Sequence, residues 1–260
     1  MGNSEAANRI DCDVATVYTA SIAPLYDDGL FSELYAQVSE IRQRKIDSMK
    51  FKKDKCLSLG VELLLMRACE DYGIDYYSET SQDISTKTTD CDAQARGDSA
   101  DLYLSDKPHF RSCSMHYNLS HSEERVMCII SEYPVGCDVE LIRPIDMSIA
   151  KQYFSAQEYE AIMSCDEPRA REEMFYRFWT LKESFMKCTG LGFKLALDEF
   201  EIEIGDERSV SASREDDEKR VCCMTKGARV LQNVDEADYL AREIELEGGY
   251  RYAFCVKCTR

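Results

Sequence analysis

The segment at 136–140 reads Gly136-Cys137-Asp138-Val139-Glu140 and lies inside a strand predicted over 135–142. Alternate side chains of a strand share a face, so the two carboxylates point one way while Cys137 and Val139 point into the core. Neighbouring carboxylates repel each other unless they are protonated or bridged by a cation. Mg²⁺ takes oxygen ligands and would bridge them. On this fragment alone, the simpler explanation is an edge strand whose acids face water.

A second segment, at 178–187, lies near the end of an amphipathic helix predicted over 171–187, which Gly190 terminates. Helical spacing of four residues places Trp179, Glu183 and Lys187 on one face. Glu183 could supply a third carboxylate and Lys187 a cation for a phosphate group. The alternative is a surface Glu–Lys pair worth about 0.3–0.5 kcal/mol.

The third segment, Asn118-Leu119-Ser120-His121-Ser122, is predicted as a turn before a strand at 125–131. Small polar side chains and a histidine can bind phosphate oxygens. A Ser–His pair also suggests hydrolysis, but neighbouring side chains project in different directions, and no G-x-S-x-G motif surrounds Ser120. Phosphate or base contact is therefore the preferred role for His121.

The rest of the chain predicts a mixed α/β or α+β fold, perhaps built from two similar halves. A strand is expected at 13–22, and helical periodicity dominates 31–69. A helix beginning at Ala156 is signalled by a capping box. Further strands are predicted at 200–204, 220–225, 228–234 and 250–256, with a polar exposed insertion at about 78–105, a turn at 107–108 and a charged loop at 206–220.

The net charge of the 260 residues is −17, from 32 basic and 49 acidic side chains, which argues against general nucleic-acid binding. The basic residues are unevenly placed, however. Segment 42–55 carries a local charge of +5, which predicts a site for a polyanionic ligand, although a solvated helix face explains it too. Its basic residues are Arg42, Arg44, Lys45, Lys50, Lys52, Lys53 and Lys55.

Localisation signals are not apparent in this sequence. No run reaches the ~18 apolar residues needed to cross a bilayer, and the first residues lack a secretory pattern. Met-Gly at the start suggests myristoylation, but Ala6 stands where that motif requires Ser or Thr. We expect a cytoplasmic protein with no membrane partner. Its 13 cysteines are expected to be reduced, and the 255–258 spacing lacks the second ligand pair of a structural zinc site.

These three segments, in this order, resemble the Sfp-type 4′-phosphopantetheinyl transferases. The resemblance covers about 31–257, and segments 107–108 and 154–159 also fit the pattern. It implies the 4′-phosphopantetheinyl transferase fold, a pseudo-twofold pair of similar α/β halves with the ligands in the cleft between them. The N-terminal half would span 1–133, with the basic segment and the insertion, and the C-terminal half 134–260, with the carboxylates.

The resemblance also assigns roles to individual residues. Asp138, Glu140 and Glu183 would hold Mg²⁺ against the pyrophosphate of coenzyme A, and Lys187 would contact one of its phosphate oxygens. The other coenzyme A contacts would be Ser120 and His121 near the 3′-phosphate and Lys107 beside the adenine. Arg42 and Lys45 would contribute from the basic segment, with Ser58 as a further candidate, and the match there needs a one-residue gap before Gly60.

The reaction implied is transfer of 4′-phosphopantetheine from coenzyme A to a serine of an apo acyl or peptidyl carrier protein, releasing 3′,5′-ADP. Glu183 is the first candidate for the base that accepts the serine proton, and Glu158 the second. Docking of the acidic carrier is expected through an apolar patch with local basic contacts. A monomer is expected, and the natural carrier and its pathway stay open.

Two other functions fit the same residues. The first is a metal-dependent phosphodiesterase or nucleotide hydrolase, although such sites often add histidine clusters and this chain has only His109, His116 and His121. The second is a non-catalytic coenzyme A-binding homologue, against which the joint presence of the carboxylates and Lys187 argues.

Overall fold

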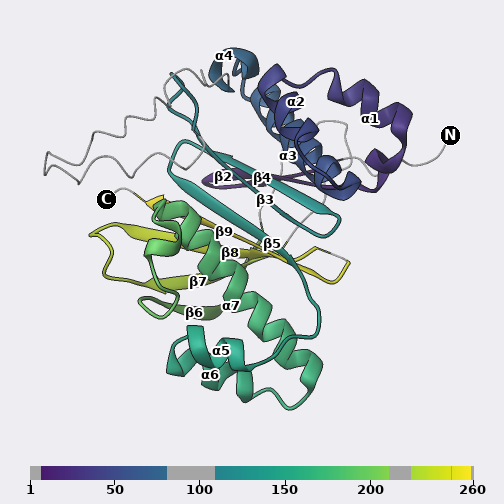
Figure 1. The fold of residues 1–260 in the computed structure, drawn as a ribbon. Helices are drawn as coiled ribbons and strands as arrows, with labels where there is room; N and C mark the ends of the chain where they lie inside the picture. Colours follow the sequence, from purple (N-terminus) through teal and green to yellow (C-terminus); the bar gives the residue numbers. More distant parts are fainter. Residues whose placement is uncertain (1–6, 81–108, 211–223, 247, 259–260) are drawn as a thin grey trace, which may run out of the picture.

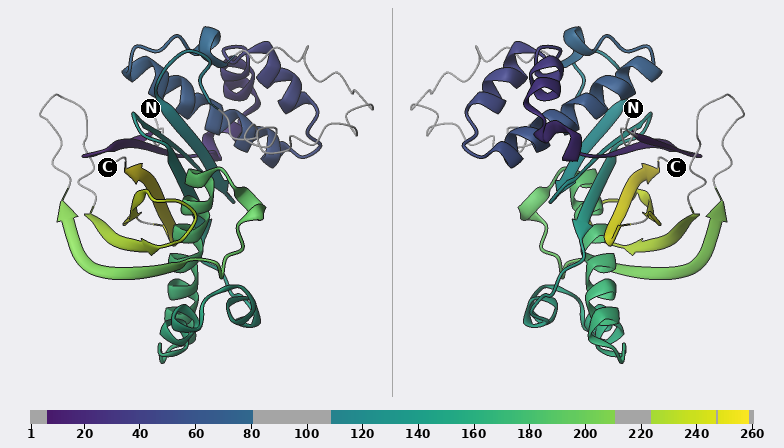
Figure 2. Two further views of the ribbon diagram at one scale, coloured as in Figure 1. Left: turned by 90° about the vertical axis from the view of Figure 1, so that its left-hand side faces the viewer. Right: turned by 90° about the vertical axis from the view of Figure 1, so that its right-hand side faces the viewer.

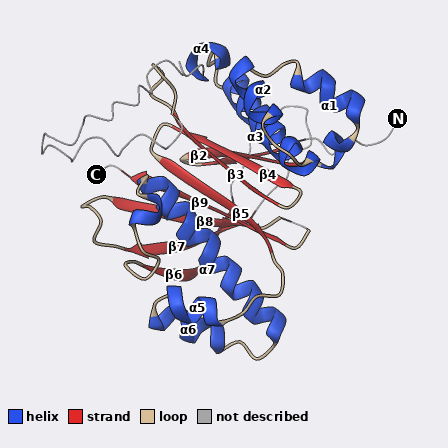
Figure 3. Ribbon diagram, viewed as in Figure 1, coloured by secondary structure: helices blue, strands red, loops and turns tan. Residues whose placement is uncertain are grey.

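The computed structural model describes residues 7–80, 109–210, 224–246 and 248–258, and shows a mixture of helices and antiparallel strands (Figures 1 and 3). The N-terminal elements are β1 (Asn8–Cys12), β2 (Ala15–Ser21), η1 (Ala23–Tyr26), α1 (Asp28–Tyr35), α2 (Glu40–Asp47), α3 (Lys52–Asp71), α4 (Tyr76–Thr80), β3 (His116–Ser122) and β4 (Arg125–Ser131). The C-terminal elements are β5 (Val135–Leu141), α5 (Ser148–Tyr153), α6 (Ala156–Met163), α7 (Pro168–Thr189), η3 (Gly192–Lys194), β6 (Glu201–Val210), β7 (Met224–Leu231), β8 (Asp238–Ile244) and β9 (Tyr250–Cys258).

The strands form two antiparallel sheets. The first sheet has the order β1-β2-β4-β3, and the second has the order β5-β9-β8-β7-β6. Helices α1 to α4 lie together at one end of the molecule, and α5 and α6 lie at the other (Figures 1 and 2). Helix α3 packs on β4, while α7 packs on β5 and β9. The expected α/β fold is therefore confirmed.

Both sheets contain the same supersecondary unit. In the first sheet, β2 is followed by the long helix α3 and the β3–β4 hairpin, giving the order β2-β4-β3. In the second, β5 is followed by the long helix α7 and, later, the β8–β9 hairpin, giving the order β5-β9-β8. In each unit the last strand pairs with the first. This repeated order is what a pair of similar α/β halves requires.

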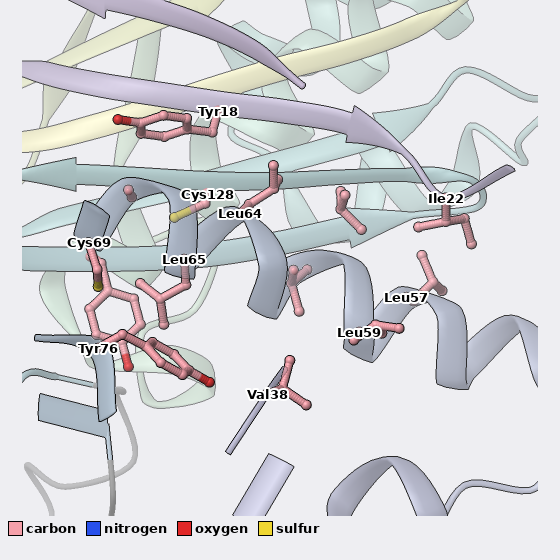
Figure 4. Packing of buried hydrophobic residues seen from close by; sticks show 14 of the residues in the cluster. Tyr18, Ile22, Val38, Leu57, Leu59, Leu64, Leu65, Cys69, Tyr76 and Cys128 are labelled. Carbon is pink, nitrogen blue, oxygen red and sulfur yellow. The ribbon is translucent and has the colours of Figure 1, made fainter. Parts of the chain in front are cut away.

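Buried residues form a core on each outer face and one between the sheets. Strand β4 explains the arrangement, because it is buried on both faces and reads as a continuous apolar run. Its residues Val126, Cys128 and Ile130 pack against the helices of the first half, whereas Met127 and Ile129 face the second sheet. Figure 4 shows part of the helix-side core, where side chains of α3 meet those of the first sheet. The expected division after residue 133 falls in the β4–β5 connection, and it stays a prediction.

Several local predictions are confirmed because they depend on neighbouring residues. At the start of α6, the Ser155 hydroxyl accepts a hydrogen bond from the Glu158 amide, while the Glu158 carboxylate accepts one from the Ser155 amide. Helix α7 ends at Gly190, whose φ of 74° is a left-handed conformation suited to glycine. Strands β2, β4, β5 and β9 lie where the pattern placed them, with Cys255 buried in β9.

Other predictions were wrong or incomplete. The predicted turn at 118–122 is part of strand β3, because its backbone pairs with β4. The long helical region divides into α1, α2 and α3, and Ser39 caps α2 through its side chain. Strand β8 is not predicted, because alanine, arginine and glutamate in its sequence favour helices. Arg177 of α7 donates hydrogen bonds to Glu243 of this strand. The predicted strand at 228–234 is mainly β7, whereas 220–223, most of the 78–105 insertion, most of the charged loop and the turn at 107–108 lie outside the described residues.

No helix within the described ranges is long and apolar enough to cross a membrane.

Candidate active site

The two sheets meet at their edge strands, β3 and β5. The amide groups that β5 turns away from its own sheet would be unpaired at this edge. Side chains of β3 accept hydrogen bonds from these amides instead. We call this contact between β3 and β5 the seam. Its bonds run from the Cys137 amide to Asn118 Oδ1 (2.9 Å), from the Val139 amide to Ser120 Oγ (3.3 Å) and from the Leu141 amide to Ser122 Oγ (3.2 Å).

A cleft of about 350 Å³ opens beside the seam and gathers all three segments that the sequence singled out. Strand β3 contributes one wall, strand β5 the carboxylate floor, and helix α7 the opposite wall. The lining residues are Leu119, Ser120, His121, Asp138, Glu140, Trp179, Glu183 and Lys187. The cleft therefore brings three carboxylates, a lysine and a histidine from distant parts of the chain to one place.

Helix α7 reaches this position because Gly136 allows it to approach β5 very closely. A Cβ atom at Gly136 would lie 2.1 Å from the Ser184 carbonyl oxygen and 2.3 Å from the Cys188 nitrogen, both in the helix backbone. The close crossing turns the face carrying Trp179, Glu183 and Lys187 into the cleft, as the spacing of four residues predicted.

Asp138 and Lys187 form the central ion pair, with Lys187 Nζ 2.7 Å from Asp138 Oδ1. Lys187 also donates to the Cys137 carbonyl oxygen, and the Ser120 hydroxyl donates to Asp138 Oδ1 at 2.9 Å. The second oxygen of Asp138, Oδ2, is buried and receives no hydrogen bond from the described residues. Such an atom is costly unless a ligand satisfies it.

Burial raises the pKa of Asp138, and Lys187 and Ser120 oppose that rise. Burial alone would lower the pKa of Lys187, but Asp138, Cys137 and Glu183 together outweigh it, so that the pKa is raised and the ammonium form is favoured. Burial and the negative charge of Asp138 raise the pKa values of both Glu140 and Glu183. The cleft thus concentrates more negative charge than one lysine neutralises.

His121 lies on the opposite side of β3 from the seam. Burial and the nearby Lys187 lower the pKa of its imidazole, which favours the neutral form. A neutral imidazole has one donor and one acceptor nitrogen, as a contact to a base or phosphate requires. Ser120 points to the seam instead, so the two neighbours do project differently.

Arg42 and Lys45 of the basic segment lie on α2, and Ser58 lies on the neighbouring helix α3. Arg42 Nη1 lies 3.4 Å from Ser58 Oγ, and its other terminal nitrogen forms an ion pair with buried Glu62, which also accepts a hydrogen bond from Tyr76. Burial and the Arg42 charge lower the pKa of Lys45. Sequence reasoning missed Glu62, because nothing in its local pattern distinguishes it from an exposed helix acid.

Glu158 does not line the cleft. Its side chain is 2% exposed, and Oε1 lies 2.9 Å from Nζ of the fully buried Lys182. The same oxygen accepts the Ile202 amide, while Lys182 donates to two carbonyl groups in 197–200. These contacts tie α6 and α7 to β6. The role predicted for Lys107 falls outside the described residues.

Comparison with known proteins agrees with this geometry. Residues 134–254 match the family model of the 4′-phosphopantetheinyl transferase superfamily. This part of the chain, its C-terminal half, resembles the superfamily. The matched residues include Asp138, Glu140, Glu183 and Lys187, whereas β3 and the basic segment lie before them.

Curated members of the superfamily show the same likeness. The chain is 34% identical over 119 residues to the 4′-phosphopantetheinyl transferase Sfp of Bacillus subtilis, covering 44% of this chain and 53% of that protein. It is 41% identical over 95 residues to psf-1 of Bacillus pumilus and 35% identical over 96 residues to HetI of a Nostoc species; each match covers 36% of this chain and 40% of the relative. The chain therefore spans about half the length of these superfamily members, or less.

Proposed function

We propose that this protein transfers 4′-phosphopantetheine from coenzyme A to a serine of an apo acyl or peptidyl carrier protein with the help of Mg²⁺. The observation that supports this most is the cleft in which Asp138, Glu140, Glu183 and Lys187 meet at the seam between the sheets. The superfamily match over the same residues supports the reaction class.

The carboxylates of the cleft suit a magnesium ion. Asp138 Oδ2 is buried without a hydrogen-bond partner in the described part of the chain, so a cation would give this oxygen a partner. Burial and Asp138 raise the pKa values of Glu140 and Glu183, and a cation would offset the repulsion between these carboxylates. Among the described residues, no three histidine, cysteine, aspartate or glutamate side chains already enclose a metal position, so binding would require at least one of the three carboxylates to turn inward. When bound, the ion would neutralise charge on the pyrophosphate oxygens.

Coenzyme A would lie along the cleft and extend to the basic segment. Arg42, Lys45 and Ser58 stand on the α2–α3 side and would meet the nucleotide phosphates, with His121 and Ser120 between them and the carboxylates. Lys107 is proposed beside the adenine on the resemblance alone. Glu62 holds Arg42 in place, so the guanidinium is positioned before the ligand arrives.

The transfer step requires a base, positive charge and a leaving group. Glu183 would accept the proton of the carrier serine, whose oxygen then forms a bond to the β-phosphorus of coenzyme A. The bond from that phosphorus to the bridging oxygen breaks, and 3′,5′-ADP leaves with the electron pair. Lys187 would donate a hydrogen bond to a phosphate oxygen as charge moves. Glu183 is preferred over Glu158 because Glu183 lines the cleft and Glu158 is held by Lys182.

Intact-protein mass spectrometry tests this function. An apo carrier protein incubated with the enzyme, coenzyme A and Mg²⁺ is expected to gain one phosphopantetheine on its serine, and to gain none with EDTA. Cleaved coenzyme A with an unmodified carrier would favour the hydrolase alternative. Bound but intact coenzyme A, with no transfer to acyl or peptidyl carriers, would favour the non-catalytic binder.

Lys187→Ala is expected to weaken coenzyme A binding at least about tenfold, because a charge-assisted hydrogen bond to phosphate is lost. Isothermal titration calorimetry measures the affinity. Lys257→Ala is a matched control, since Lys257 also lies 2.7 Å from an aspartate, Asp235, but outside the cleft. Equal dissociation constants for Lys187→Ala and the parent protein would remove Lys187 from the binding site.

We also propose that the protein acts as a monomer in the cytoplasm. Each half supplies one side of the cleft within a single chain, so no second copy is needed to complete the site. Light scattering after gel filtration tests this, and a stable dimer would contradict it.

A further inference from the structure

The seam contains a regular arrangement that neither the superfamily match nor the reaction explains. Strands β3 and β5 run in the same direction with a constant offset of 19 residues between bonded positions. Every second side chain of β3 therefore meets an outward-pointing amide of β5. All three side chains of β3 that take part accept such a bond, but only two of them also hold a carboxylate.

Ser122 shows how this works. Its hydroxyl oxygen accepts a hydrogen bond from the Leu141 amide at 3.2 Å, and its proton is donated to Glu140 Oε2 at 2.7 Å. A serine hydroxyl carries one proton. Because the amide occupies an acceptor position, the proton is directed at the carboxylate of the preceding residue on β5. Ser120 makes the equivalent pair of bonds with the Val139 amide and Asp138.

Glu140 needs such a restraint more than Asp138 does. Asp138 is 4% exposed and is also fixed by Lys187, whereas Glu140 is only partly buried, has a longer side chain and lies near the end of its strand. The Ser122 bond engages one carboxylate oxygen of Glu140, which leaves the group able to present the other to the cleft. Ser122 itself does not line the cleft, so it can act only through Glu140.

We propose that Ser122 is a positioning residue, which fixes the Glu140 carboxylate for a divalent cation. This inference rests on the proposed function, since it assumes that Glu140 is a metal ligand. Groups that orient metal ligands commonly change metal affinity about 10- to 100-fold when they are removed. The hydroxyl of Ser122 is therefore expected to matter for cation binding even without coenzyme A or a carrier.

The experiment measures Mn²⁺ binding to the full-length protein by electron paramagnetic resonance, with no substrate present. Ser122→Ala is expected to raise the dissociation constant about tenfold. Ser122→Thr retains the hydroxyl and should stay within about twofold of the parent protein. Ser122→Val has nearly the shape of threonine without the hydroxyl, so it should behave like Ser122→Ala and replaces it if that variant does not fold.

Asn118→Ala provides the control for damage to the seam. Asn118 accepts the Cys137 amide in the same row, but it contacts neither carboxylate. Its loss should lower the melting temperature much as Ser122→Ala does and leave Mn²⁺ affinity unchanged. A crystal structure of metal-free Ser122→Ala is expected to show the Glu140 carboxylate displaced from its parent position.

The outcomes separate this inference from the proposed function. Parent-like Mn²⁺ affinity in both Ser122→Ala and Ser122→Val would overturn it, as would an equal loss in Asn118→Ala, which would reduce Ser122 to a seam contact. An unmoved Glu140 in the crystal structure would overturn it without any metal measurement. If the parent protein binds no Mn²⁺, the proposed metal site fails and the positioning role fails with it.

Discussion

Asp138→Asn is expected to reduce phosphopantetheine transfer about a hundred- to a thousandfold, because loss of one preorganised polar group in such a site typically costs that much. Asparagine keeps the size of the side chain and removes the negative charge. Asp138 is central to the cleft: it pairs with Lys187 and raises the pKa values of both Glu140 and Glu183. Its loss removes the carboxylate that we propose as a metal ligand, and with it the charged partner of Lys187. Carrier modification followed by mass spectrometry measures the rate.

Asp235→Asn is the matched control for this prediction. Asp235 forms an ion pair with Lys257 at the same distance, 2.7 Å, but outside the cleft, so its loss should leave the transfer rate within about twofold. Glu183→Gln should resemble Asp138→Asn, because Glu183 lines the same cleft. A folded Asp138→Asn variant with parent-like turnover would rule out the proposed metal site.

The sequence could predict the features that depend on local pattern. Alternation along β5 put Asp138 and Glu140 on one face and Cys137 and Val139 in the core. Helical spacing put Trp179, Glu183 and Lys187 on one face of α7, and the capping box of α6 is formed by residues three apart. Each of these is settled within a few residues of chain, where the geometry of helices and strands is fixed.

Features that depend on distant pairing could not be predicted in the same way. The polar side chains of residues 118–122 predict a turn, yet those side chains accept hydrogen bonds from the edge of another strand. The sequence predicts Glu158 as a second candidate base, but it cannot show the contact that Glu158 of α6 makes with Lys182 of α7. The partner of Arg42, Glu62, lies 20 positions along the chain and only the packing of α2 on α3 identifies it.

The seam also explains why the cleft lies between the halves rather than within one. An exposed edge strand offers unpaired amides that invite association with other chains. Here the edge strands β3 and β5 meet, and polar side chains of β3 accept hydrogen bonds from amides of β5. Two of these side chains, Ser120 and Ser122, also donate to carboxylates of the cleft. A continuous backbone ladder would have needed no such groups. The polar character of β3 therefore follows from a contact in which side chains, and not backbone hydrogen bonds, connect the two sheets.

Gly136→Ala is expected to destabilise the protein by about 3 kcal/mol or more, at the upper end of overpacking effects. The added Cβ would lie 2.1, 2.3 and 2.8 Å from three backbone atoms of α7, which cannot rotate away as a side chain can. Helix α7 must therefore move off β5, carrying Glu183 and Lys187 out of the cleft. Transfer should fall even at temperatures where the variant is folded. Chemical denaturation measures the stability, and the carrier assay measures the rate.

Gly60→Ala supplies the graded comparison in the first half. Its Cβ would lie 2.9 Å from Ile22 Cγ2 and 3.3 Å from Val126 Cγ1, and both of these side-chain atoms can move aside. Helix propensity favours alanine over glycine by about 1 kcal/mol, which offsets part of the strain, so the net loss should be about 1 kcal/mol. If Gly136→Ala costs no more than Gly60→Ala, α7 does not rest on β5 as closely as described. The glycine would then not be what places Glu183 and Lys187 beside Asp138.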